Sequence, residues 1–172
     1  MDTVHFLIDQ FKLSRGKIFE LLNEVPHDVW FKNAGAPNSN VAWQVGHLVL
    51  ASNYHCISLV LGINEAMIQK DSFKIYMKYC IGLGSINRSL PEGFISVEDL
   101  ISDLKEVHDI SITGLRNLQD SDLNRPLEPT KMKHPFAKTK YEALSWAFKH
   151  DIWHCAEIEN LKMNLGIGHK WM

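Results

Sequence analysis

The stretch from Thr139 to Leu165 carries the strongest local signals in the chain, and they predict a long helix. Thr139 and Glu142 have the spacing of a capping box, in which a hydroxyl and a carboxylate satisfy backbone donors of the first turn. Gly166 suits a C-terminal cap. Between these ends a stripe recurs at steps of three and four, which is typical of the inner face of a packed helix. The stripe consists of Ala143, Ala147, His150, His154, Glu157 and Leu161.

Two histidines, His150 and His154, lie on this stripe one turn apart. Residues four apart on a helix have Cβ atoms about 5–6 Å apart, so both rings can turn toward one divalent ion. The pair alone is a weak motif, because nine histidines in 172 residues give about 0.5 such pairs by chance. Core histidines that are hydrogen-bonded to other groups are therefore the alternative to metal ligands.

Composition limits the class of protein. A chain of 172 residues, 45% of them hydrophobic, fits one domain over residues 1–172 with a substantial core. The 18 basic and 20 acidic residues are interspersed, which gives no basic face for nucleic acid and no membrane-binding patch. No apolar run is long enough to span a bilayer and no signal peptide is evident, so we expect a cytoplasmic protein.

The cysteines do not indicate a metal site. Cys56, Cys80 and Cys155 are odd in number and lack close metal-type spacing, which favours free thiols in a reducing compartment. We interpret them as small core or boundary residues rather than catalytic thiols.

Three further amphipathic helices are predicted, over residues 3–25, 40–61 and 96–118. The longest connection, residues 63–95, is expected to contain a short helix at 71–79 and to serve either as a lid or pocket wall or as a structural crossover. Four amphipathic helices without an alternating strand pattern predict an all-α, four-helix bundle.

One histidine, His47, lies on the inward stripe of the second helix, about two turns from its start. At that depth it can meet His150 and His154 at the same level of a bundle. His55 is one step off the stripe and is expected at the boundary or in solvent. His108 flanks the stripe of the third helix and is a further candidate ligand.

Two segments carry a family resemblance. Residues 43–48 read Trp-Gln-Val-Gly-His-Leu, and residues 150–154 read His-Asp-Ile-Trp-His. In their order and separation these segments resemble the DinB/YfiT-like superfamily. The resemblance implies a bundle of the up-up-down-down type in which three histidines bind a divalent metal, nickel or zinc. By matched position, these ligands are His47, His150 and His154.

The resemblance also implies an activity. Characterised relatives include thiol-dependent enzymes, among them bacillithiol transferases and a mycothiol-dependent isomerase, and homodimers are frequent. This chain departs from the family at residues 155–158, which read Cys-Ala-Glu-Ile where Arg-Gly-Gln-Ile is often found. No role of that arginine or glutamine is therefore carried over.

Three histidine ligands would leave positions for water or substrate, as in catalytic zinc sites. A bound dication acidifies water or a thiol. Together with the resemblance, this chemistry leads us to expect a thiol transferase acting on a small electrophile, with a low-molecular-weight thiol as co-substrate. The alternatives are a metal-dependent hydrolase and a non-catalytic metal-binding sensor or interaction bundle.

Two more residues are candidates for supporting roles. Glu157 lies one turn beyond His154 and could orient a ligand ring, accept a proton or simply reach solvent. Trp43 lies one turn before His47 and could either wall a pocket or belong to the core.

Overall fold

The computed structural model of this chain describes residues 2–35, 38–82 and 88–168. Over these residues the regular structure is helical and contains no strand, so the all-α prediction is confirmed. The α-helices are α1 (Thr3–Asn23), α2 (Val41–Ser52), α3 (Glu65–Ile68), α4 (Asp71–Tyr79), α5 (Val97–Leu115) and α6 (Lys140–Asn164). Short 3-10 helices lie at His27–Val29 (η1) and Asp120–Asn124 (η3), and α2 continues into a π-helical turn, η2, at Asn53–Ser58.

The helix ends follow the sequence signals. The Thr139 hydroxyl accepts a hydrogen bond from the Glu142 backbone N–H at 3.3 Å, and the Thr139 N–H donates to the Glu142 carboxylate at 3.1 Å. The predicted capping box is thus confirmed. Asn40 caps α2 by accepting from the Trp43 N–H at 2.8 Å. Gly166, with φ +74°, follows the end of α6.

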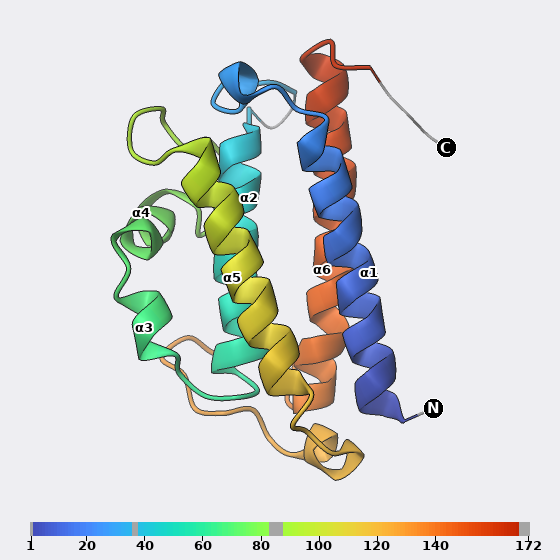
Figure 1. The fold of residues 1–172 in the computed structure, drawn as a ribbon. Helices are drawn as coiled ribbons and strands as arrows, with labels where there is room; N and C mark the ends of the chain where they lie inside the picture. The colour runs from blue at the N-terminus through green and yellow to red at the C-terminus, as the bar shows by residue number, and fades with distance from the viewer. Residues whose placement is uncertain (1, 36–37, 83–87, 169–172) are drawn as a thin grey trace.

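Four long helices, α1, α2, α5 and α6, lie side by side, while α3 and α4 sit outside them in the connection between α2 and α5 (Figure 1). In chain order they run up, down, down and up (Figure 1). Contacts agree with these directions: Lys162 near the end of α6 pairs with Glu24 at the end of α1, whereas Lys140 at the start of α6 donates to the Val60 carbonyl.

The expected up-up-down-down order is therefore wrong. That order needs two long crossovers that run the length of the bundle. Here one such crossover, residues 63–95, joins the parallel helices α2 and α5, and the other two connections return at the end where they start (Figure 1). The expected short helix within the crossover is confirmed as α4, and residues 83–87 lie outside the described residues. No helix of the described residues has an apolar stretch long enough to cross a membrane.

A glycine on α2 sets how closely the crossover packs. A Cβ atom at Gly46 would lie 2.8 Å from Cys80 Sγ and 2.9 Å from Tyr76 Cδ1. Because Gly46 lacks this atom, α4 and the residues after it approach α2 closely. This approach brings the Cys80 carbonyl beside His47.

A buried ion pair joins α1 to α6. Arg15 and Asp151 are 0% and 2% exposed, and Arg15 donates to both carboxylate oxygens, from Nη2 at 3.0 Å and from Nε at 3.2 Å. Arg15 Nη2 also donates to Ser52 Oγ at 2.6 Å, which ties in the end of α2. Because Asp151 directly follows His150, the pair fixes the rotation of α6 about its axis.

Candidate metal centre

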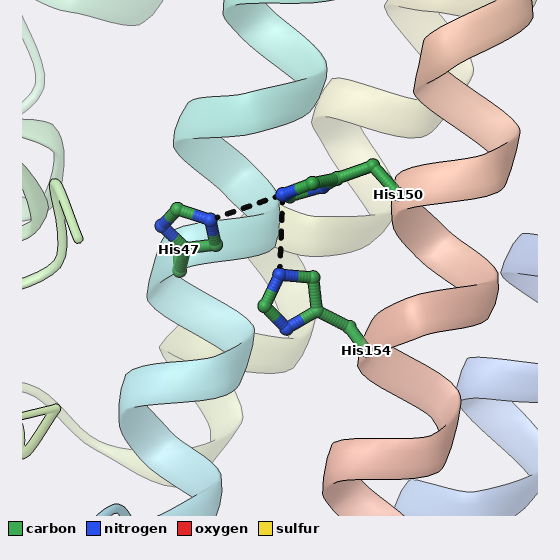
Figure 2. Close-up of side chains that lie close together, drawn as sticks. All are labelled: His47, His150 and His154. Atoms are coloured by element: carbon green, nitrogen blue, oxygen red, sulfur yellow. Dashed lines mark hydrogen bonds between the residues drawn. The ribbon is translucent and has the colours of Figure 1, made fainter. Parts of the chain in front are cut away.

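Three histidines from α2 and α6 converge between the helices (Figure 2). His150 Nε2 lies 3.3 Å from His47 Nε2 and 3.2 Å from His154 Nε2, and one nitrogen of each ring lies within 4.8 Å of the others. Two nitrogens that each lie about 2.0–2.1 Å from one ion, at a tetrahedral angle, are about 3.3–3.4 Å apart. The spacing around His150 therefore suits a single divalent ion, and the structure brings together the three residues singled out from the sequence.

Hydrogen bonds fix which nitrogens of two of these rings face the cluster. His47 Nδ1 donates to the Cys80 carbonyl at 2.7 Å. His154 Nδ1 donates to Gln44 Oε1 at 2.5 Å, and a carboxylate oxygen of Glu157 lies 3.2 Å from the same nitrogen. Since a neutral imidazole carries one N–H, both Nε2 atoms present lone pairs to the cluster.

The Nε2 lone pairs of His47 and His154 each need a hydrogen-bond donor, and His150 cannot supply both. With its proton on Nε2, it offers one N–H to two lone pairs, and its buried Nδ1 has no hydrogen-bond partner among the described residues. With its proton on Nδ1, three lone pairs converge with no donor between them. In either state the cluster lacks hydrogen-bond donors, which a cation would replace. The residues present therefore fit a divalent metal.

Burial keeps the His47 and His150 rings neutral, as metal ligands must be. Desolvation, assisted by the neighbouring His154 ring, lowers the pKa of His47 from 6.5 to about 4, although the Cys80 carbonyl acts in the opposite direction. Desolvation and the His154 and His47 rings also lower the pKa of His150. At neutral pH their lone pairs are free to bind an ion.

The metal-free protein is expected to lose stability as pH falls from about 6.5 to about 4. The unfolded chain takes up protons on its histidines near pH 6.5, whereas folded His47 and His108 take them up only near pH 4. The free energy of unfolding therefore rises with pH through this window. Urea denaturation in the presence of a chelator measures it, and His108→Gln should reduce the slope. A free energy of unfolding that stays constant over this window would contradict the assignment.

A buried amide, Gln44, orients His154. Its side chain is 1% exposed, and its Nε2 donates at 3.1 Å to Ser39 Oγ, which in turn donates at 2.8 Å to the Arg88 carbonyl. Gln44 was not among the candidate site residues predicted from the sequence. The available signal was its place three residues before His47, one turn earlier on the same side of α2.

Replacing Gln44 with leucine is expected to weaken zinc binding about tenfold. The apolar side chain keeps the volume but removes the acceptor that holds His154 Nδ1, and losses of about 10- to 100-fold are usual for such supporting groups. We place the effect at the low end because Glu157 lies near the same nitrogen. Competition with a chromophoric chelator measures the affinity. Gln44→Glu restores an acceptor and should bind zinc like the wild type; equal affinity for the leucine variant would refute the role.

Glu157 contacts the cluster through His154. Its Oε1 accepts from Arg88 Nη1 at 2.7 Å and from Trp153 Nε1 at 3.2 Å. Desolvation acts to raise its pKa, but the His154 ring and the Arg88 guanidinium outweigh it and lower the pKa to about 2. Of the three roles considered for Glu157, its position favours holding a ligand ring in place.

Trp43 belongs to the core and packs against the histidine cluster. It is 1% exposed and stacks on the His47 ring with centroids 4.9 Å apart and planes 5° apart. Its Nε1 donates to the Tyr79 carbonyl at 2.9 Å. Gly82, with φ +76°, passes so close that an added Cβ would lie 3.1 Å from His47 Cε1. Together these groups limit the movement of the His47 ring.

Two other histidines, His55 and His108, were also assigned positions from the sequence. His55 is buried, so its expected place at the boundary or in solvent is wrong. The reason is the π-helical turn η2, in which one extra residue shifts the helical register by roughly 100°. His108 packs on Phe11 with ring centroids 5.2 Å apart and belongs to no group that could hold a metal among the described residues.

The cysteines are free, as expected. Cys56 and Cys80 are buried and Cys155 is partly buried. Burial raises the pKa of each thiol to about 12. None of them is therefore suited to act as a thiolate nucleophile at neutral pH.

The sequence was compared with known proteins. The family model described as the DinB superfamily matches residues 10–158. The matched region runs from the second turn of α1 into the last third of α6 and includes all three histidines of the cluster. No curated protein matches the chain.

Proposed function

Since the chain belongs to the DinB superfamily, we propose that it binds one divalent metal ion, zinc or nickel, through His47, His150 and His154. One observation supports this most strongly. The Nδ1 protons of His47 and His154 are already donated elsewhere, so their Nε2 lone pairs converge on His150 without a sufficient number of donors. Three protein ligands are one fewer than a closed structural zinc site uses.

We infer a thiol-dependent transferase as the activity. When bound, a dication in this site would lower the pKa of a coordinated thiol or water. The carboxylates beside the cluster, Glu157 and Asp151, are each held by an arginine. Hydrolases commonly use a free general base to deprotonate water. A thiol, with a pKa of about 8.5, loses its proton more readily and depends less on such a base. Because burial raises the pKa of the chain's own cysteines, the thiol would come from a co-substrate.

An assay with and without thiols tests the activity. The zinc-loaded protein is mixed with a small electrophile, such as 1-chloro-2,4-dinitrobenzene, and with glutathione, cysteine or no thiol. A transferase gives thiol-dependent product faster than the uncatalysed reaction does, and His150→Ala should lose this excess rate while His108→Asn keeps it. Consumption that is independent of thiol would favour the hydrolase. No turnover with any thiol would favour the non-catalytic sensor.

We also infer a four-helix bundle that forms a homodimer, has no nucleic-acid partner and is cytoplasmic. Exposed apolar side chains on α1 and α6 support a dimer, since Leu13, Ile152 and Trp153 are 68%, 52% and 60% exposed. The three free cysteines support a reducing compartment. The molar mass measured by light scattering after size-exclusion chromatography would distinguish a dimer from a monomer.

A further inference from the structure

Beside the histidine cluster, five aromatic side chains form a closed circuit. Starting from His150, the neighbouring ring centroids are separated by 5.8 Å to His55, 5.1 Å to His134, 4.5 Å to Phe136, 4.9 Å to Trp146 and 6.0 Å back to His150. These residues come from η2, the connection before α6, and α6 itself. Of the five, His150 alone belongs to the candidate metal centre. We call this arrangement the five-ring circuit.

The circuit holds three ring nitrogens with no hydrogen-bond partner among the described residues. These are His55 Nδ1, His134 Nε2 and His150 Nδ1, and all three atoms are buried. The side chains of His55 and His134 are only 8% and 9% exposed. Each unpaired buried polar group is costly, and three in one circuit indicate that a partner is missing.

The tautomer of His134 tells which kind of partner is missing. His134 Nδ1 accepts hydrogen bonds from the backbone N–H groups of Ala137 at 2.8 Å and Phe136 at 3.3 Å. The proton of the neutral ring therefore lies on Nε2, which is a donor. A second metal ion would need a lone pair at that nitrogen, so the circuit is not a second metal site. It requires an acceptor.

His150 supplies a second donor when its Nε2 faces a metal ion, because its proton then lies on Nδ1. An acceptor atom with two lone pairs, such as a carbonyl oxygen, matches two donors. The negative charge of Glu142 acts on His134, and Glu142 and Lys149 both line a neighbouring pocket. An anion would lose its hydration among these rings and would lie near the negative charge of Glu142, so the circuit favours an uncharged acceptor.

An aromatic pocket of about 460 Å³ opens next to the circuit. It is lined by Phe136, Tyr141, Glu142, Ser145, Trp146 and Lys149. Phe136 and Trp146 belong to both the pocket and the circuit, so their rings separate the pocket from the unpaired nitrogens. Phe136 is 53% exposed, so a turn of its ring toward solvent would connect the pocket with the circuit.

We propose that the pocket and the five-ring circuit form a subsite for an uncharged aromatic or apolar small molecule with a carbonyl or amide oxygen. The pocket holds the apolar body, and the oxygen accepts from His134 Nε2 and His150 Nδ1. The inference rests on the proposed function only through His150. Metal binding at His150 Nε2 leaves the ring proton on Nδ1, where it serves as a donor. The subsite places this molecule directly beside the metal centre.

Benzamide is a suitable probe, with benzoate and benzylamine as charged counterparts of the same size. It is titrated into zinc-loaded protein labelled with ¹⁵N-histidine and followed by long-range ¹H–¹⁵N spectra. We expect the His134 Nε2 and His150 Nδ1 signals to shift along one binding curve. Benzoate and benzylamine should bind more weakly.

A pair of variants isolates the donor. His134→Asn keeps an acceptor at the position of Nδ1 for the two backbone N–H groups but has no counterpart of Nε2–H. It should bind benzamide about 3- to 10-fold more weakly, the usual effect of losing one hydrogen bond. His108→Asn changes another histidine whose Nδ1 is unpaired among the described residues, away from the circuit, and should bind like the wild type.

Several results would overturn the subsite: a His134 signal that does not respond, equal benzamide affinity in His134→Asn, or tighter binding of benzoate. Zinc content is measured on the same samples. A chain that binds no zinc but still shifts His134 with benzamide would refute the metal centre and keep the subsite. If the chain binds zinc but the His134 Nε2 signal does not shift with benzamide, the subsite is refuted and the metal centre is not.

Discussion

Replacing His150 with alanine is expected to reduce bound zinc or nickel from one ion per chain to almost none. His150 is the central member of the cluster, since its Nε2 lies 3.3 Å and 3.2 Å from the Nε2 atoms of His47 and His154. Without it, two imidazoles from different helices remain. Loss of a direct ligand should exceed the 10- to 100-fold effect of a supporting group, so we expect affinity to fall on the order of 100-fold or more.

Elemental analysis of protein purified without a metal-affinity tag measures this loss. His108→Ala is the matched control, because it removes a partly buried histidine that belongs to no candidate metal group of the described residues. Circular dichroism would check that both variants remain helical. If His150→Ala retained as much metal as the wild type, the ligand set would be wrong.

Removing the guanidinium of Arg15 is expected to destabilise the fold by about 3–5 kcal/mol, the usual cost of breaking a buried ion pair from one side. Asp151 is 2% exposed, and in Arg15→Ala its charge would lose both Arg15 hydrogen bonds and keep a single 3.3 Å contact to Ser14 Oγ. The free energy of unfolding in urea measures the effect.

Two comparisons make this result specific. Arg15→Met combined with Asp151→Leu removes both charges and should recover much of the loss, because an apolar pair of similar size often replaces a buried ion pair. Lys17→Ala breaks the exposed pair with Glu20 and should change stability by at most about 0.5 kcal/mol. A loss below about 1 kcal/mol in Arg15→Ala would show that the pair does not hold α1 to α6.

Much of this structure is predictable because its signals are local. The cap at Thr139 and the three-and-four spacing of the last stripe specify α6 within a few turns of chain. The inward position of His47 follows from the same periodicity in α2. Given two helices packed together, those positions already place His47 level with His150 and His154.

The rest depends on contacts between segments far apart in the chain. The directions of the four long helices depend on which connection runs along their length, and periodicity within a helix carries no such information. The π-helical turn η2 turned His55 inward, and local spacing gave no sign of it. The hydrogen bond from His154 to Gln44 spans 110 residues, so sequence alone could place Gln44 on the correct face but could not name its partner.

X-ray absorption at the zinc edge of the tag-free, zinc-loaded protein tests the central claim most directly. The account predicts one zinc per chain with the scattering of three imidazole rings bound through nitrogen at about 2.0–2.1 Å. A spectrum with sulfur at about 2.3 Å, fewer than three imidazoles, or no bound zinc would contradict it.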